Sequence, residues 1–257
     1  MNILCVGNSF AVDVATYVHQ IAKSVGKDIK IVVLYIPGCP VNKHWERFLD
    51  QYPEYELYVN GDRNPLMTCS FNEGFNYCDK WDYITFQQRS GDSGNPDTFF
   101  PELTLLMDEL RKKSAAKFLL HETWSYAKTF QHEKYGSNPM DQAAMDADIR
   151  NAYLEVSKKT NVDKIIPTGL GIELARQVFG DELTRDGYHL NERGRTLAGM
   201  IWAYYFLGSK NDFSNFIPKG FTYDDVTGPV DEKELEILRN IAKKALDNNK
   251  GHNIYED

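Results

Sequence analysis

Three residues far apart in the chain carry the functional groups of a nucleophilic triad. Ser9 lies in Gly7-Asn8-Ser9-Phe10, while Asp186 and His189 belong to a single segment, Asp186-Gly187-Tyr188-His189. A serine hydroxyl at its free pKa is a poor nucleophile, so it needs a base to take its proton and a third group to orient that base. The Asp-x-x-His segment can supply both from one loop. The expected chemistry is acyl transfer.

The elements around Ser9 place it where such chemistry usually occurs. The short apolar run at 2–6 predicts a strand, and the apolar spacing over 12–25 predicts a helix. Ser9 therefore follows a strand and begins a helix. Ligands of open parallel sheets bind beyond the carboxyl ends of the strands, where helix N-termini present free N–H groups.

Further strands alternate with helices along the chain, which is typical of βαβ units. β-branched or apolar runs predict strands at 30–36, 82–86, 117–120 and 164–166, and helical spacing predicts helices at 101–113, 141–159 and 193–207. The pattern predicts an α/β fold, a three-layer α/β/α sandwich around a mainly parallel five-stranded sheet.

Two segments depart from this alternation. Residues 52–79 are rich in Tyr and Asn, and the turn signal Asn60-Gly61 predicts an inserted hairpin or cap. Residues 209–257 are expected to form a C-terminal extension, with Pro and Gly over 213–230 followed by an amphipathic helix at 232–246. At 257 residues, one domain of residues 1–208 plus this extension is expected.

The amino-acid composition limits the kinds of partner that the protein is expected to bind. The formal charge of −8 disfavours nucleic acid and anionic membranes, which call for clustered Lys and Arg. No run of about 18 apolar residues is present, and the chain enters its first strand without a charged leader, so a soluble protein is expected. The compartment, cytoplasmic or exported, and the oligomeric state stay open. The fourteen Phe, fifteen Tyr and four Trp favour some aromatic cleft walls, although most should be core.

The four cysteines give no sign of a metal site. Cys5, Cys39, Cys69 and Cys78 form no CxxC pair and have no histidine at zinc-ligand spacing. We therefore expect no metal and no cofactor. A disulfide between Cys69 and Cys78 is possible in an exported protein, but free thiols are preferred.

The motifs and their order resemble a known family. Gly7-Asn8-Ser9-Phe10, Gly38 after the second strand, a polar block after the third and Asp186-x-x-His189 are similar to the four blocks of the SGNH (GDSL-type) hydrolases. The Gly-Asn-Ser-Phe, Trp-Asp-x-x-Thr-x-Gln-Gln and His-x-Thr-Trp segments further resemble a bacterial subgroup whose biochemical role is not established. The resemblance spans about the first 208 residues.

This resemblance implies a role for each matching residue. Ser9 would be the nucleophile, His189 the general base and acid, and Asp186 the residue that orients it. The backbone N–H groups of Ser9 and Gly38 would bind the oxyanion, since a glycine lets the backbone approach a ligand closely. The turn after Pro37 explains Gly38 equally well.

The third oxyanion donor departs from the family pattern. Relatives place an Asn in a Gly-x-Asn-Asp block, whereas this chain has Gln87-Gln88-Arg89-Ser90-Gly91-Asp92. A glutamine amide offers the same donor on a longer arm, so Gln88, or failing it Gln87, is the candidate. Strand alternation sends these two side chains to opposite faces, so the choice stays open. Asn8 replaces the Asp of many relatives.

Other polar residues at the same rim are candidates for lining the substrate. They are Asn8, Gln87, Ser90, His121 and Trp124. His121 follows the fourth strand and could also act as an alternative base with Glu122, but a structural or lining role is preferred. Trp124 is as consistent with a cleft wall as with core.

The leading hypothesis is a serine esterase that hydrolyses small polar esters, such as O-acetyl groups on carbohydrates, through an acyl-enzyme. The alternative is a carbohydrate-binding protein that kept the fold and lost turnover, because the third block departs from the pattern. Phosphoester hydrolysis is a third option that the absence of a P-loop or metal cluster in the sequence disfavours. The expected partner is a small-molecule or glycan ester.

Overall fold

The five predicted strands form the parallel centre of one sheet. The computed structural model describes residues 1–137, 139–162, 164–218 and 230–249. The parallel strands are β1 (Asn2–Gly7), β2 (Lys30–Tyr35), β5 (Tyr83–Phe86), β6 (Lys117–His121) and β9 (Lys164–Ile166), in the order β2-β1-β5-β6-β9. This is a doubly wound order that reverses at β1. The first βα turn, which carries Ser9, therefore lies at the switch point.

The predicted hairpin extends this sheet. Strands β3 (Tyr55–Val59) and β4 (Met67–Cys69) are antiparallel, and β3 pairs with the outer edge of β2. The sheet therefore has seven strands rather than five. The pairing buries Tyr55 and Leu57 and satisfies the backbone groups that β2 would otherwise expose at an edge. Asn60 and Gly61 have φ of 56° and 77° and are the central residues of a tight turn, which the Asp62 N–H closes by donating to the Val59 carbonyl oxygen at 3.0 Å. This turn is the first part of a longer connection to β4.

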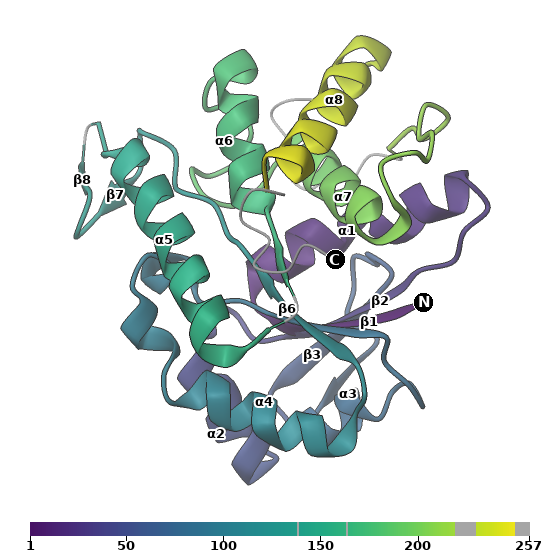
Figure 1. Ribbon diagram of the computed structural model, residues 1–257, viewed down its shortest axis with the longest axis vertical. Coiled ribbons are helices and arrows are strands. Elements are labelled where there is room, and N and C mark those ends of the chain that lie inside the picture. Colours follow the sequence, from purple (N-terminus) through teal and green to yellow (C-terminus); the bar gives the residue numbers. More distant parts are fainter. Residues whose placement is uncertain (138, 163, 219–229, 250–257) are drawn as a thin grey trace.

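Helices cover both faces of the sheet, as Figure 1 shows. One face carries α1 (Ser9–Ser24), α6 (Thr168–Phe179), α7 (Glu192–Leu207) and α8 (Glu232–Asn249), and the other carries α2 (Val41–Asp50), α4 (Glu102–Lys113) and α5 (Gln142–Thr160). Right-handed crossovers place helices on opposite faces once the strand order reverses. The predicted three-layer α/β architecture with a mostly parallel sheet is confirmed.

Several short elements were not predicted. They are α2, α3 (Phe71–Phe75), α6, the 3₁₀ turns η1 (Ser90–Asp92) and η2 (Pro96–Phe99), and the small ribbon of β7 (Gln131–His132) and β8 (Gly136–Ser137). In α6 two glycines lower the helix propensity. Packing explains one of them, because a Cβ at Gly169 would lie 2.0 Å from the Thr123 carbonyl oxygen.

The C-terminal extension is described in part. Phe213 and Phe216 are buried, residues 219–229 of the predicted wrap lie outside the described residues, and α8 then packs against α6 and α7. All four cysteines are free thiols, including Cys69 and Cys78. No described helix combines the length and the apolar character that crossing a bilayer requires.

Candidate active site

Ser9 is the first residue of α1, at the carboxyl end of β1. Asn8 caps this helix, and its Oδ1 accepts a hydrogen bond from the Phe10 N–H at 3.1 Å. Gly7 precedes it because no larger residue fits: an added Cβ would lie 2.8 Å from Ala11 Cβ and 3.2 Å from the Gln87 side chain. The Gly-Asn-Ser sequence therefore makes a tight strand-to-helix turn that presents the Ser9 hydroxyl at the edge of the sheet.

Ser9, His189 and Asp186 form a continuous hydrogen-bonded chain. Ser9 Oγ lies 2.8 Å from His189 Nε2, and His189 Nδ1 lies 2.6 Å from Asp186 Oδ2. An ionised carboxylate can only accept, so Nδ1 carries the proton and Nε2 is left to accept from the serine hydroxyl. This is the tautomer that a general base needs.

The segment 184–190 holds the Asp and the His in register. Asp186 Oδ1 accepts from the backbone N–H groups of Tyr188 at 3.2 Å and His189 at 2.8 Å, and the Arg185 N–H donates to the His189 carbonyl oxygen at 2.9 Å. Partial burial would raise the pKa of the Asp186 carboxyl. The hydrogen bonds from His189 and Tyr188 and the charge of the imidazole outweigh burial and hold this pKa below its ordinary value. Asp186 therefore stays ionised beside the imidazole.

Two backbone N–H groups are available in the turns at Ser9 and Gly38. Ser9 is at the first turn of α1, where N–H groups have no partner within the helix. Gly38 has φ of 55°, a left-handed conformation that favours glycine, in the turn after β2. Within the described part of the chain, neither N–H donates a hydrogen bond. Both N–H groups are thus available to donate to a bound ligand.

Gln88 does not provide the predicted third donor. Its Nε2 donates to the Thr98 carbonyl oxygen at 2.7 Å, and its Oε1 accepts from the Val41 N–H at 2.9 Å. The side chain is fully buried and ties η2 to the start of α2. The prediction was wrong because a longer amide reaches buried backbone groups on the opposite side of the strand.

Gln87 and Asn8 are buried parts of the scaffold of the Ser9 turn, not lining residues. Gln87 Nε2 donates to Asn8 Oδ1 at 2.8 Å, and Asn8 Nδ2 donates to the Cys39 carbonyl oxygen at 3.2 Å. Gln87 Oε1 in turn accepts from His121 Nδ1 at 2.6 Å. This buried network, His121–Gln87–Asn8–Cys39, connects the Ser9 turn to the residue after Gly38 and so links the two N–H donors.

His121 belongs to that network and is unsuited to be a base for Ser9. Its side chain is 1% exposed, and burial lowers its pKa to about 3, so the ring stays neutral. The neighbouring Glu122 does not pair with it, since Glu122 Oε1 accepts from the Leu170 N–H at 3.0 Å. Among the described residues, His121 Nε2 has no hydrogen-bond partner.

Trp124 is core rather than a cleft wall. Its ring is fully buried and stacks on Phe10 with centroids 3.9 Å apart, and its Nε1 donates to the Tyr188 carbonyl oxygen at 2.7 Å. It therefore supports both the helix after Ser9 and the loop that carries His189. Ser90 is half-buried, and its hydroxyl lies 2.8 Å from the Tyr126 hydroxyl.

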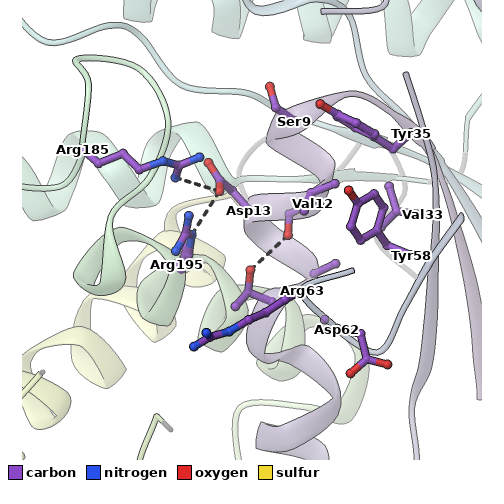
Figure 2. A pocket seen from close by; sticks show the side chains of 13 residues that line it. Ser9, Val12, Asp13, Val33, Tyr35, Tyr58, Asp62, Arg63, Arg185 and Arg195 are labelled. Atoms are coloured by element: carbon purple, nitrogen blue, oxygen red, sulfur yellow. Dashed lines mark hydrogen bonds and ion pairs between the residues drawn. The ribbon is translucent and has the colours of Figure 1, made fainter. Parts of the chain in front are cut away.

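A pocket opens beside Ser9, along the first two turns of α1 (Figure 2). It measures about 280 Å³ and is lined by Ser9, Val12, Asp13, Ala15, Thr16, Val33, Tyr35, Tyr58, Gly61, Asp62, Arg63, Arg185 and Arg195. The sequence-based interpretation missed its polar residues. Two signals were present: Asp13 is four residues after Ser9, hence on the same helical face, and Arg185 directly precedes Asp186.

A family model covers almost the whole chain. Residues 2–244 match the domain of unknown function DUF4886. The chain belongs to the DUF4886 family. Another DUF4886 protein, from Bacteroides uniformis, has a crystal structure that superposes with a TM-score of 0.84 at 27% identity, over 96% of this chain and 94% of that one. No curated protein matches the chain.

More distant solved structures share the DUF4886 fold. Axe2, an acetylxylan esterase from Geobacillus stearothermophilus, superposes with a TM-score of 0.53 at 15% identity, over 82% of this chain and 95% of that one. A protein from Slackia heliotrinireducens, provisionally assigned to the SGNH hydrolases, superposes with a TM-score of 0.55 at 17% identity, over 80% of this chain and 98% of that one. The superfamily resemblance is therefore supported at the level of the fold.

Proposed function

We propose that this protein is a serine ester hydrolase of the SGNH type. The observation that carries the proposal is the Ser9–His189–Asp186 chain, with 2.8 Å from hydroxyl to imidazole and 2.6 Å from imidazole to carboxylate. These distances are within the range at which a base takes a proton from its nucleophile. The fold shared with SGNH hydrolases supports the same conclusion.

The reaction follows from the placement of these groups. Ser9 Oγ attacks the ester carbonyl carbon while His189 Nε2 takes the hydroxyl proton. The N–H groups of Ser9 and Gly38 stabilise the resulting oxyanion. The C–O bond to the alcohol then breaks, and Nε2 returns the proton to the leaving oxygen. A water molecule repeats both steps on the acyl-enzyme and releases the acid and free Ser9.

Small polar esters, including O-acetyl groups on carbohydrates, are the substrates we propose. The pocket beside Ser9 is lined by tyrosines, arginines and aspartates together with Val12, Ala15 and Val33, so it offers a polar ester both hydrogen-bonding groups and apolar walls. The acetylxylan esterase among the structural neighbours acts on an ester of this kind. A glycan-binding protein without turnover is the alternative, favoured by one observation: the amide of Gln88 is engaged by Thr98, so Gln88 does not supply the third donor of the family pattern.

Covalent labelling tests the proposal without a choice of natural substrate. Treatment with a fluorophosphonate, followed by peptide mass spectrometry, should place a single adduct on the peptide that contains Ser9. The same protein should hydrolyse p-nitrophenyl acetate, and Ser9→Ala should lose both properties. Glycan binding without an adduct or hydrolysis would instead favour the binding protein, and an adduct that persists in Ser9→Ala would rule out Ser9 as nucleophile.

A further inference from the structure

We infer that the pocket beside Ser9 selects esters that carry a carboxylate on the part of the molecule away from the reacting carbonyl. This inference rests on the proposed esterase function and specifies its substrate class. It is drawn from the size of the pocket, from the charges that line it, and from the hydrogen bonds of Arg185.

The pocket is larger than an acetyl group requires. Its volume of about 280 Å³ is near the lower end of the about 300–1,000 Å³ of typical small-molecule sites. It extends from Ser9 along α1 to the tip of the β3–β4 hairpin at Gly61, Asp62 and Arg63 (Figure 2). A substituent of several non-hydrogen atoms can therefore lie in it while its carbonyl group lies at Ser9.

The lining carries an excess of positive charge, although the whole chain has a formal charge of −8. Three arginines line the pocket, Arg63, Arg185 and Arg195, against two aspartates, Asp13 and Asp62. Asp13 is almost completely buried, and its Oδ1 accepts from Arg185 Nη1 and from Arg195 Nε, both at 3.1 Å. One carboxylate is thus shared by two guanidinium groups. In Figure 2 the carboxylate of Asp62 points away from Ser9.

Arg185 is the residue best placed to bind an anion. In the described structure, all of its side-chain hydrogen bonds leave from Nη1, to Asp13 Oδ1 and to the Leu190 carbonyl oxygen. Nε and Nη2 remain as donors, and the two bonds hold the planar group in place in advance. A guanidinium fixed in this way matches a carboxylate in geometry as well as charge. Arg185 directly precedes Asp186, so the bound group lies close to the catalytic loop.

The walls of the pocket are consistent with a polar ligand. Tyr35 and Tyr58 contribute flat faces with hydroxyl groups (Figure 2), and Thr16 of α1 also lines the pocket. An apolar acyl chain in this space would desolvate the guanidinium of Arg185 without replacing its water, which is costly. A carboxylate replaces that water with a charge-assisted hydrogen bond.

The first test compares matched anionic and neutral esters on the unmodified protein. One arm places the charge on the acyl group, with mono-p-nitrophenyl esters of glutaric and adipic acid against the corresponding terminal amides. The other arm places it on the alcohol, with 4-acetoxybenzoate against 4-acetoxybenzamide. We expect kcat/KM to favour the anionic member of one arm by about tenfold to a hundredfold, the range of a charged hydrogen bond. The preference should shrink as salt is added.

The second test assigns the preference to Arg185. Arg185→Gln should reduce the anionic-to-neutral ratio to near one, whereas Arg185→Lys should keep part of it. Arg111→Gln is the matched control, because it removes an exposed arginine on α4, on the other face of the sheet, and should leave the ratio unchanged. The ratio is used because any distortion of the neighbouring catalytic loop affects both substrates alike.

The outcomes separate this inference from the proposed function. Hydrolysis of all esters without preference for the anionic member in either arm would overturn the carboxylate-selective pocket and leave the esterase intact. A preference that survives Arg185→Gln would overturn the role of Arg185. Absence of hydrolysis for every ester, with no fluorophosphonate adduct, would overturn the proposed function itself and this inference with it.

Discussion

Two polar networks meet at Ser9, and they differ in exposure. On one side, His189 and Asp186 lie on a partly exposed loop, with side chains 18% and 41% exposed. On the other side, His121 and Gln87 are buried behind the same turn, 1% and 2% exposed. Each network contains a histidine whose Nδ1 donates to an oxygen, at 2.6 Å in both cases.

The partner and the surroundings give these histidines different chemistry. His189 donates to a carboxylate, which can stabilise a positive imidazolium during proton transfer. His121 donates to a neutral amide, and burial makes its protonation costly, so its pKa is held near 3. The comparison teaches that a histidine suited to act as a base has a carboxylate partner and some access to solvent, whereas a fully buried histidine beside an amide stays neutral.

The largest expected effect comes from breaking the exposed network. Ser9→Ala and His189→Ala should each lower kcat by about 10⁴-fold or more, and the double variant should lose little beyond either single one, because the two residues act as a unit. Steady-state kinetics on p-nitrophenyl acetate measure this. Losses that multiply in the double variant would contradict a shared proton-transfer step.

Glu122 directly follows His121 and is also buried. Its titration tests whether burial controls protonation beside the buried network. Burial raises its pKa to about 7, so between the ordinary value of 4.5 and about 7 the folded protein binds more protons than the unfolded chain. The contribution of protonated Glu122 to the free energy of unfolding is therefore fully present below pH 4.5, and it is lost as the pH rises through 7.

Glu122→Gln should remove this pH dependence, because Oε1 of a glutamine can still accept from the Leu170 N–H. Relative to wild type, the variant should gain up to about 3 kcal/mol in free energy of unfolding between pH 5 and pH 8. Urea denaturation at the two pH values measures the difference. Parallel changes in both proteins would show that Glu122 ionises normally.

Disrupting the buried network should lower the rate because the Ser9 and Gly38 turns shift relative to each other, and not because proton transfer changes. Gln87→Met leaves His121 Nδ1 without a partner and leaves Asn8 Oδ1 with the Phe10 N–H alone, so the link between the Ser9 turn and the Gly38 turn weakens. We expect kcat to fall about tenfold to a hundredfold, within the cost of an unpaired buried group. KM and the pH profile should change little.

A matched control separates this effect from general destabilisation. Tyr55→Phe removes the buried hydrogen bond between the Tyr55 hydroxyl and His44 Nδ1, 2.9 Å long, on the β3 side of the sheet. Comparable loss of thermal stability with an unchanged kcat is expected. If affinity for a trifluoromethyl ketone transition-state analogue is unchanged in Gln87→Met, the buried network does not position the oxyanion donors.

The smallest effect should come from the contact between the core and the exposed loop. Trp124→Phe keeps an aromatic ring against Phe10 and removes the hydrogen bond to the Tyr188 carbonyl oxygen. We expect a loss of about 1 kcal/mol in unfolding free energy and less than about a fivefold fall in kcat. A fall as large as that of His189→Ala would mean that this bond alone sets the position of His189.

The sequence by itself determined the parallel strands, the turn that presents Ser9 and the spacing of Asp186 and His189. Apolar runs, a helix N-terminus and an i, i+3 pair are local patterns, and the forces behind them act between neighbours in the chain. The block order also predicted the fold of the described domain. The short distance from Ser9 to His189, 180 positions later in the chain, arises only from the tertiary fold.

Only the tertiary structure decided which polar residues are buried and what they bind. Gln87 and Gln88 are adjacent and identical, yet one reaches Asn8 and the other reaches Thr98 and Val41. Trp124 became core because Phe10 lies against its ring. Such outcomes depend on which backbone groups from distant segments need a partner at that point, and no local pattern in the chain encodes that.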